Sequence, residues 1–461
     1  MSPLDLLHST AERANAVRTI QKISQKPLLL AIGLAVAMSF APFDNAHAIP
    51  PFARQTGLEC NACHTAYPQL TPLGRQFKLN GYTMGHTKAY ERVGAWLQGS
   101  FTHTQRDQAG GAGDGYGDND NFALQQASFF YGGKVFGKVG AFLQGTYDGI
   151  GKVWGWDNME MRYADTTSVG GHQIVYGLSA NNSPGVQDLW NTTPVWSFPF
   201  DASDLAPGPS AATLIEGGLG QISAGLTAFA MVDSHLYAEF GGYHVIPHGA
   251  IQTLTGDAEG APKSKGLAPY WRLAWQQDSG ANDFEIGAFG IHANLYPGGD
   301  KSAGTDSFTD IGFDAQIQRF MGNDSITARA SLIQEFQRLS ATQMLEGSDN
   351  LKNRLRTLNT SVAYLFDKTY QLTGGVSHIW GVPDMTFYGT LDGSPNSTSL
   401  TAEADWLPFN KKPLPIYPWF NPKFSAQYVH YLKLDGVTNS GAGGQKALYA
   451  DTLFLLLTLT F

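Results

Sequence analysis

The last nine residues of the chain carry the pattern that most restricts its fold. Side chains in a strand alternate between its two faces. Leu453, Leu455, Leu457 and Leu459 therefore share one face, and Phe461 ends the chain on that same face. An apolar face that ends on a terminal aromatic is the form of strand that the assembly machinery of outer-membrane barrels recognises. The alternative is a buried core strand of a soluble β-protein.

The same period of two recurs through the rest of the chain. Residues 96–101, 140–147, 270–275 and 424–429 alternate apolar with polar or small side chains and carry aromatics near their ends. Segments of about ten residues with this alternation indicate strands of an outer-membrane barrel. We therefore predict an all-β fold, a transmembrane antiparallel β-barrel of about 16 strands, and closed bacterial barrels require such an even count. The predicted strands are 93–103, 121–134, 136–149, 157–166, 172–180, 218–231, 235–245, 267–278, 282–294, 307–320, 324–338, 353–367, 369–380, 398–407, 421–434 and 446–461.

Composition and the connections between strands agree with a barrel. Charged residues make up 15% of the chain, whereas about a quarter is usual in soluble domains. No apolar run after residue 48 is long enough for a membrane-spanning helix of about 20 residues. Short and long connections alternate, which predicts long external loops and periplasmic termini. The Pro-rich connection 408–420 is an exception, because a short turn is expected there.

The N-terminus predicts export. Residues 1–26 are basic, residues 27–40 form an apolar run, and Ala46-His47-Ala48 offers a small-x-small cleavage site. This order is typical of a secretory signal, so we assign residues 1–48 to a signal peptide. A membrane anchor is the alternative, but the apolar run is too short for one.

Cys60-Asn61-Ala62-Cys63-His64 is the motif that carries chemistry. Its two cysteines are the only ones in the chain, and C-x-x-C-H is the attachment signal for c-type haem. Cys60 and Cys63 would each form a thioether, and His64 would ligate the iron. The alternatives are a disulfide or half of a zinc site, but zinc would need a second pair of ligands. We predict one covalently attached haem c.

The predicted haem segment is too small to bury a haem alone. It covers residues 49–90, and chains of about 40 residues rarely hold a core. A barrel of about sixteen strands, residues 91–461, leaves a lumen wide enough for loops or solvent. We therefore expect the segment to lie inside the lumen and to use the barrel interior as its missing wall.

The tract around the motif resembles a known family. Residues 51–57, Cys60-Asn61-Ala62-Cys63-His64, and 68–82 with Gly74-Arg75-Gln76-Phe77-Lys78 are similar to the N-terminal signature of the fused outer-membrane cytochrome–porins, whose best-known members serve iron-oxidising bacteria. The resemblance implies an outer-membrane electron conduit. It would pass electrons from an extracellular donor, Fe(II) above all, to a periplasmic cytochrome or copper protein. An Fe(II):cytochrome c oxidoreductase activity stays open. The alternatives are a conduit for another donor or acceptor, and a porin whose haem segment is a plug or redox sensor.

The sixth iron ligand and the propionate partners are less constrained by the sequence. Met84 follows His64 by twenty residues, and a thioether ligand there would raise the haem potential. His86 is the alternative that would lower it, and His103 of the barrel or no protein ligand stays open. Arg54 and Arg75 are candidates to pair with the propionates, as is Lys78, because Arg makes paired contacts with carboxylates.

Charge and two loops suggest the kind of partner. The formal net charge of −9 argues against nucleic acid and favours cationic partners. The loop 104–120 holds Asp107, Asp114, Asp118 and Asp120 and could attract Fe²⁺ or hold Ca²⁺, but a loop of Gly and Asp is usually only flexible and solvated. The loop 186–196 is rich in aromatics, so it either folds inward over the haem or sits at the membrane interface.

Overall fold

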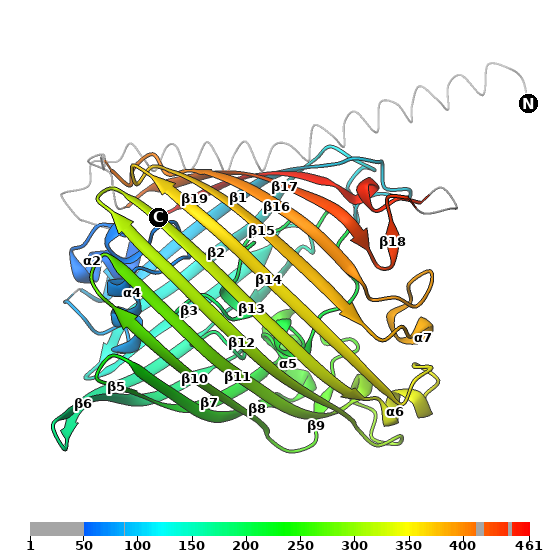
Figure 1. Ribbon diagram of the computed structural model, residues 1–461, viewed down its shortest axis with the longest axis horizontal. Coiled ribbons are helices and arrows are strands. Elements are labelled where there is room, and N and C mark those ends of the chain that lie inside the picture. Colours follow the sequence, from blue (N-terminus) through cyan, green and yellow to red (C-terminus); the bar gives the residue numbers. More distant parts are fainter. Residues whose placement is uncertain (1–49, 87, 412–418, 441–444) are drawn as a thin grey trace, which may run out of the picture. The chain divides into compact units, whose positions relative to one another are not determined.

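The computed structural model describes residues 50–86, 88–411, 419–440 and 445–461. The predicted signal peptide, residues 1–48, lies outside the described residues. Within them, one sheet of nineteen strands curves into a closed barrel (Figure 1). Three of these strands are short additions at the ends of the barrel, β4 (Val153–Trp156), β9 (Lys263–Ser264) and β18 (Val437–Thr438). The other sixteen strands of the described chain form the barrel wall.

The wall strands follow one another in chain order, and every neighbouring pair is antiparallel. They are β1 (Val93–Thr104), β2 (Asn121–Phe136), β3 (Val139–Asp148), β5 (Glu160–Val169), β6 (His172–Asn181), β7 (Ser223–Val232), β8 (Leu236–Val245), β10 (Ala268–Asp278), β11 (Asn282–Tyr296), β12 (Asp306–Met321), β13 (Asp324–Arg338), β14 (Lys352–Phe366), β15 (Tyr370–Gly381), β16 (Ser397–Trp406), β17 (Asn421–Leu434) and β19 (Thr452–Thr460).

The first and last strands close the barrel. β1 pairs with β19 in an antiparallel register that runs from Trp96 opposite Thr460 to Thr104 opposite Thr452. The backbone of Ala95 and Phe461 extends this ladder by one more pair of hydrogen bonds, at 3.0 and 2.8 Å. Closure matters because the membrane interior offers no water to satisfy an open strand edge. The apolar terminal strand predicted from the sequence is therefore the strand that seals the barrel.

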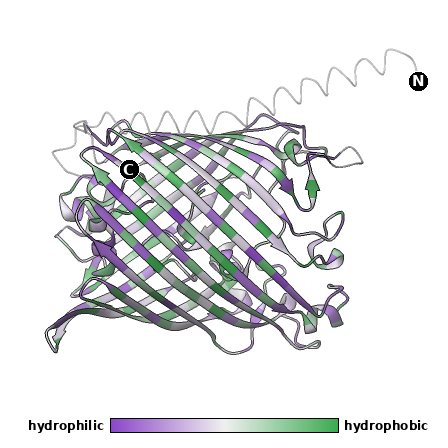
Figure 2. Cartoon of the chain, in the orientation of Figure 1, coloured by the Kyte–Doolittle hydropathy of each residue, from purple (hydrophilic) through white to green (hydrophobic). Residues whose placement is uncertain are grey.

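The alternation of the strands separates a lipid-facing surface from the lumen. In β7, Leu226 is 58% exposed while its neighbour Thr227 is buried, and in β8 Phe240 is 66% exposed while Glu239 is buried. Figure 2 shows the resulting stripes of hydrophobic and hydrophilic residues across the strands. An apolar outer face with polar residues inside is the pattern of an outer-membrane barrel. This chain has that porin-like barrel fold.

The two ends of the barrel differ. The connections at one end are short, such as 137–138, 279–281 and 322–323, and the start of β1 and the end of β19 lie there as well. We call it the short-turn end and the opposite one the long-loop end. The connection 407–420 is longer than its neighbours at the short-turn end, and its residues 412–418 lie outside the described chain.

Short helices lie at both ends and within the lumen. No helix among the described residues is long and apolar enough to span a membrane. In Figure 1, α2 and α4 lie toward the short-turn end and α6 and α7 toward the long-loop end. The helices are α2 (Pro50–Thr56), α3 (Cys60–Cys63), α4 (Pro72–Leu79), α5 (His248–Thr255), α6 (Ser340–Met344) and α7 (Met385–Tyr388), with the 3-10 turns η1 (Ala89–Arg92), η2 (Pro194–Trp196), η3 (Leu214–Glu216), η4 (Pro297–Gly299) and η5 (Ala447–Ala450).

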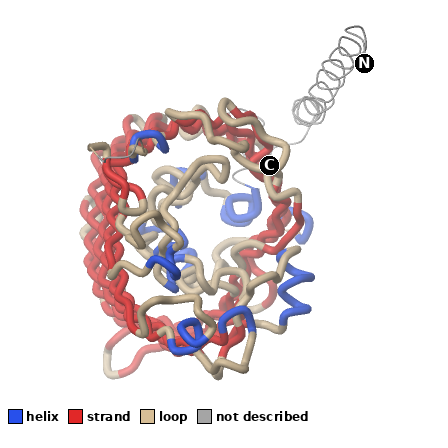
Figure 3. The backbone as a smooth tube through the Cα atoms, turned by 90° about the vertical axis from the view of Figure 1, so that its right-hand side faces the viewer, coloured by secondary structure: helices blue, strands red, loops and turns tan. Residues whose placement is uncertain are grey.

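Two chain segments fill the lumen, and Figure 3 shows them as loops and helices inside the ring of strands. One is the N-terminal segment 50–86, and the other is the connection 182–222 between β6 and β7. A core of buried apolar side chains joins both to the wall. It includes Leu79 of the first segment, Leu189 and Trp190 of the second, and Phe229 and Tyr237 of the wall.

The predicted strands are confirmed, with boundary differences of a few residues. The largest difference is at β19, which begins at Thr452 rather than near residue 446. The reason is a 3-10 turn at 447–450, where the chain folds back onto β17 before it enters the sheet. Residues 446–451 have the composition of a strand, but packing of this turn against β17 keeps them out of the sheet.

The N-terminal segment approaches the wall most closely at two glycines. A Cβ atom built on Gly140 of β3 would lie 2.0 Å from the carbonyl oxygen of Gly81. Gly81 itself has a φ of 67°, a left-handed conformation that glycine adopts readily. The segment can therefore lie flat against β3 only because both positions lack a side chain.

We predict that Gly140→Val loosens the N-terminal segment without opening the barrel. Overpacking a tight contact costs about 1–3 kcal/mol. We therefore expect tryptic cleavage at the buried Arg75 and Lys78 to become roughly tenfold faster, while heat-modifiable migration of the barrel persists. The matched control is Gly145→Val on the same strand, since a Cβ there meets nothing within 4 Å. Equal cleavage rates for both variants would contradict this account.

Candidate functional site

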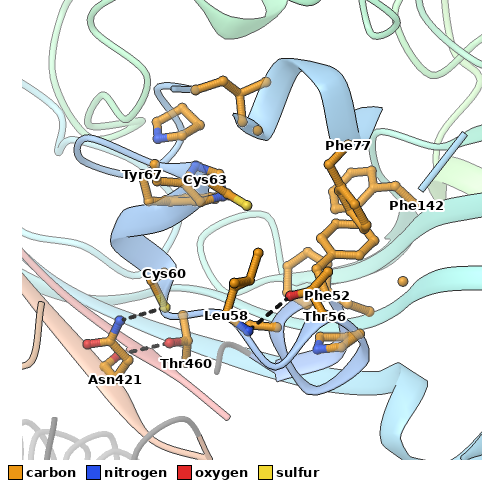
Figure 4. Close-up of a pocket in the computed structure, with 18 of the residues that line it drawn as sticks. Phe52, Thr56, Leu58, Cys60, Cys63, Tyr67, Phe77, Phe142, Asn421 and Thr460 are labelled. Atoms are coloured by element: carbon orange, nitrogen blue, oxygen red, sulfur yellow. Dashed lines mark hydrogen bonds between the residues drawn. The ribbon is translucent and has the colours of Figure 1, made fainter. Parts of the chain in front are cut away.

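A cavity at the short-turn end of the barrel brings the motif residues together. Cys60, Cys63 and His64 line it from the N-terminal segment, and about 1550 Å³ of space is empty when counted out to its open side. Figure 4 shows Cys60 and Cys63 on one side of the cavity and Phe52, Phe77 and Phe142 on the other. The barrel strands contribute a second part of the wall, namely Ala95 and Trp96 of β1, Phe130 and Gly132 of β2, Phe142 of β3, Asn421 and Lys423 of β17, and Thr458 and Thr460 of β19.

The two cysteines sit on a single helical turn. α3 begins at Cys60 and ends at Cys63, and the His64 amide donates to the Cys60 carbonyl at 2.9 Å. The thiols are not joined in a disulfide. The Asn421 side-chain amide lies 3.6 Å from the Cys60 sulfur (Figure 4). Burial and the neighbouring Cys60 raise the pKa of the Cys63 thiol to about 11. The Cys63 sulfur is thus held as a neutral thiol in an apolar cavity.

His64 is placed as a neutral imidazole. Burial lowers its pKa to about 4, although the carbonyl groups of Pro68 and Gln69 act in the opposite direction. Neutral imidazole is the form of histidine that binds metals. Its Nδ1 is buried and has no hydrogen-bond partner of normal geometry among the described residues.

The turn that follows the motif is held from the lumen. Asn191 of the 182–222 connection accepts a hydrogen bond from the Leu70 amide at 3.0 Å and donates to the Pro68 carbonyl at 3.4 Å. Asn191 has a left-handed backbone with φ of 60°, which asparagine tolerates better than most residues. Lys78 adds a second link, because its Nζ donates to the Val186 carbonyl at 2.5 Å. The lumen connection is therefore a support for the segment that carries His64.

That connection is itself fixed to the wall by buried charge. Asp188 accepts hydrogen bonds from the amides of Trp190, Thr192 and Thr193 at 2.9–3.1 Å. Its carboxylate also lies 3.3 Å from Arg272 of β10, and neither side chain is exposed. Burial alone would raise the pKa of Asp188, but Arg272 and the backbone amides hold it below its usual range. Arg272 in turn contacts Asp314 at 2.6 Å on β12.

The predicted propionate partners have other roles in the fold. Arg75 forms an ion pair with Asp283 of β11 at 2.7 Å and donates to Gln318 of β12. Arg54 donates to the carbonyls of Glu91 and Val93 and lies over the ring of Trp419 at 4.1 Å. Neither arginine is among the residues that line the cavity. Both anchor the N-terminal segment to the barrel.

The predicted sixth ligands are also away from the cavity. Met84 is 36% exposed and is not among the lining residues, and His86 is exposed as well. His103 is half-buried on β1 and pairs with Asp120 at 2.7 Å. Met84 as an iron ligand thus stays a prediction that the geometry does not favour. No group of three or more metal-ligating side chains occurs among the described residues, including the acidic loop 104–120.

The aromatic loop 186–196 does fold inward, as one of its two sequence interpretations predicted. Trp190 is fully buried, and Trp196 lines the cavity and stacks on Phe200 at 5.9 Å. Lys78 lines the cavity too, and burial lowers its pKa to about 8.

Sequence reasoning missed the wall residues of the cavity. Lys423 of β17 lies in its lining, donates to the Tyr67 carbonyl and pairs with Asp405 at 3.4 Å. Phe424 is 40% exposed on the outer face, and adjacent residues of a strand point to opposite faces, so Lys423 points into the lumen. The alternation could have found it as an inward-facing base, but not its distance from Cys60.

These residues fit a covalently bound haem. The two thiols and the neutral histidine meet in one cavity, its lining is mainly aromatic and aliphatic, and two lysines supply positive charge for carboxylates. If Nε2 of His64 ligated the iron, the buried Nδ1 would donate to a backbone carbonyl, and the carbonyls of Pro68 and Gln69 act on this ring.

Comparisons with known proteins found distant likenesses to solved structures only. No protein-family model matches the chain, and no curated protein matches it. Among solved structures, it is similar to the high-pH form of OprB from Pseudomonas putida, at 12% identity and a TM-score of 0.46 over 80% of this chain and 94% of that one. It is also similar to an anion-selective porin from Comamonas acidovorans, at 8% identity. The TM-score is 0.44, over 80% of this chain and 98% of that one. The outer-membrane channel DcaP of Acinetobacter baumannii is similar at 10% identity, with a TM-score of 0.41 over 80% of this chain and 96% of that one. At these values the likeness carries no conclusion about activity, and the fold rests on the strand pairing above.

We predict that Arg272→Met destabilises the lumen connection. Removing one partner of a buried ion pair leaves uncompensated charge and costs about 3–5 kcal/mol. We expect a lower free energy of unfolding in denaturant and faster proteolysis within 182–222. The control is Arg319→Met, because Arg319 is exposed on the outer face of β12. A stability loss of equal size in both variants would show that the buried cluster is not what fixes the connection.

Proposed function

We propose that this chain is an outer-membrane electron conduit that uses a single haem c attached through Cys60 and Cys63. The observation that carries the proposal is the shared cavity, in which the only two cysteines of the chain and the adjacent His64 meet residues of the barrel wall. A bound haem would supply one-electron exchange at iron. Phe52, Phe77 and their aromatic neighbours would exclude water from it.

A filled lumen supports electron transfer over free diffusion of solutes. Arg162, Arg272, Glu285 and Gln318 all point into the lumen, yet each is fully buried. In a water-filled channel such polar side chains would be exposed. Here the N-terminal segment and the 182–222 connection cover them.

The direction of transfer follows from a proposed orientation. We place the short-turn end, with the cavity, toward the periplasm and the long loops outside. Fe(II) would then give up one electron outside the cell and become Fe(III). One oxidised cytochrome or copper protein in the periplasm would take up that electron. A net charge of −9 favours a cationic donor.

We predict that Cys63→Ala abolishes covalent haem and leaves a heat-modifiable barrel in the outer membrane. The reason is that Cys63 faces the cavity and makes no disulfide or other link on which the wall depends. The measurement is haem staining of the denatured protein beside its heat-modifiable migration. Loss of the barrel as well would mean that haem attachment is required for folding.

We also predict that Met84→Ala leaves the haem absorption spectrum unchanged, because Met84 is exposed outside the cavity. His86→Ala serves as the second variant, since His86 is exposed too. If the absorption band of a thioether-ligated haem were lost in Met84→Ala alone, residues 80–86 would have to rearrange when haem binds, and Met84 would be the sixth ligand.

The main test is stopped-flow reduction of the oxidised, haem-loaded protein by Fe(II), with the midpoint potential measured on the same sample. Rapid reduction and a potential above that of the iron couple at working pH would support Fe(II) as the donor. A low potential with no reduction would leave a conduit for another extracellular donor or acceptor.

A porin with a haem-bearing plug is the second candidate, and the porin-like barrel favours it. Proteoliposome swelling separates the two functions. A conduit should admit no sugar either in the unaltered chain or in Gly140→Val, whereas a plugged porin should admit sugar in Gly140→Val, in which the segment is displaced.

A further inference from the structure

Four basic side chains share the outer face of two neighbouring strands at the long-loop end. Arg338 of β13 is paired in register with Lys352 of β14, and the next two rows pair Phe336 with Arg354 and Gln334 with Arg356. These positions alternate with the buried Glu335 and Leu355, so their side chains point away from the lumen. None of the four forms an ion pair with another described residue.

The guanidinium groups are oriented but not satisfied. Arg356 Nε donates to Gln334 Oε1 at 2.9 Å, and its guanidinium lies 6.0 Å from the ring of Trp380. Arg354 lies over the ring of Phe336 at 5.5 Å. Each guanidinium offers five N–H donors in a planar fork that suits phosphate. Most of these donors remain available to a ligand.

The depth of the cluster matches the headgroup region of the membrane. Trp380 is paired with Arg356 and stacks with His378 at 4.7 Å on the same outer face. Tryptophans of outer-membrane barrels gather at the membrane–water interface. A charge on the lipid-facing surface is costly at the centre of the bilayer and cheap near its interface. Arg354 and Arg356 therefore lie where lipid phosphates lie.

An apolar groove lies on the same outer face, two residue rows from the cluster toward the middle of the membrane. It holds about 650 Å³ of empty space, counted out to its open side. Small side chains form its floor, and a Cβ built on Gly374 would meet nothing within 4 Å. Its outward-facing lining comprises Ala315, Ile317, Ala328, Ala330, Thr360, Val362, Gly374 and Val376.

We propose that this surface binds one phosphorylated glycolipid of the outer leaflet, lipid A in chemical class, with its phosphates on Arg354 and Arg356 and an acyl chain in the groove. The charge of the cluster is complementary to the phosphates, and the groove begins two residue rows below it, where acyl chains begin. The proposal rests on the orientation proposed above, which puts the long-loop end outside the cell.

The test is native mass spectrometry of the full haem-loaded chain, extracted from outer membranes in mild detergent. We expect one phosphorylated glycolipid per barrel, and roughly tenfold less of it in the double variant Arg354→Gln/Arg356→Gln. The matched control is Arg319→Gln, which removes an exposed outward arginine at the short-turn end and should retain the lipid.

A second pair of variants tests the groove. Gly374→Phe should fill it and lower retention of the lipid, whereas Gly145→Phe, at another open position, should not. Equal retention in the arginine variants and the control would overturn the proposal. So would the capture of phospholipid alone, or a change of oligomeric state in Gly374→Phe with the lipid retained, since the face would then contact a second copy. None of these readouts uses electron transfer, so failure of the conduit would be seen separately.

Discussion

Closure of the backbone ladder is the constraint on which the rest of this structure depends. Within a membrane, every amide and carbonyl of a strand must find a partner in the protein. Here the last strand meets that need by pairing with both β17 and β1. Once the sheet is closed, its outer face must be apolar and its polar side chains must point into one lumen. The size and contents of that lumen then decide what the protein can do.

The lumen contains two chain segments held to its wall by polar contacts. Asp188 and Arg272 fix the connection 182–222, while Arg75 and Asp283 fix the N-terminal segment. Buried ion pairs of this kind contribute more to geometry than to net stability, because desolvation offsets most of their attraction. Their effect is to bring Asn191 against the turn that follows His64. The cavity is therefore built by three parts of the chain that are far apart in sequence.

The inner face of one set of strands and the outer face of another carry separate functions in the proposals above. The inner face of β1, β2, β3, β17 and β19 walls the cavity of the motif. The outer face of β13 and β14 carries unpaired arginines at the level of the lipid headgroups. The two faces are independent because a strand assigns alternate residues to each. Substitutions on one face can therefore be tested without disturbing the other.

The sequence by itself determined the strands, the barrel and the motif. The alternation of apolar and polar side chains is a local property. The segments 453–459 and 271–275 therefore predict lipid-facing strands without reference to any other part of the chain. The spacing of Cys60, Cys63 and His64 predicts covalent haem attachment without reference to the fold. The tertiary structure decided the rest. It turned Arg54 and Arg75 into anchors, left Met84 outside the cavity and brought Lys423 into it. The alternation predicts which residues face the lumen. It does not predict their contacts across the lumen, because those depend on how the two inner segments fold.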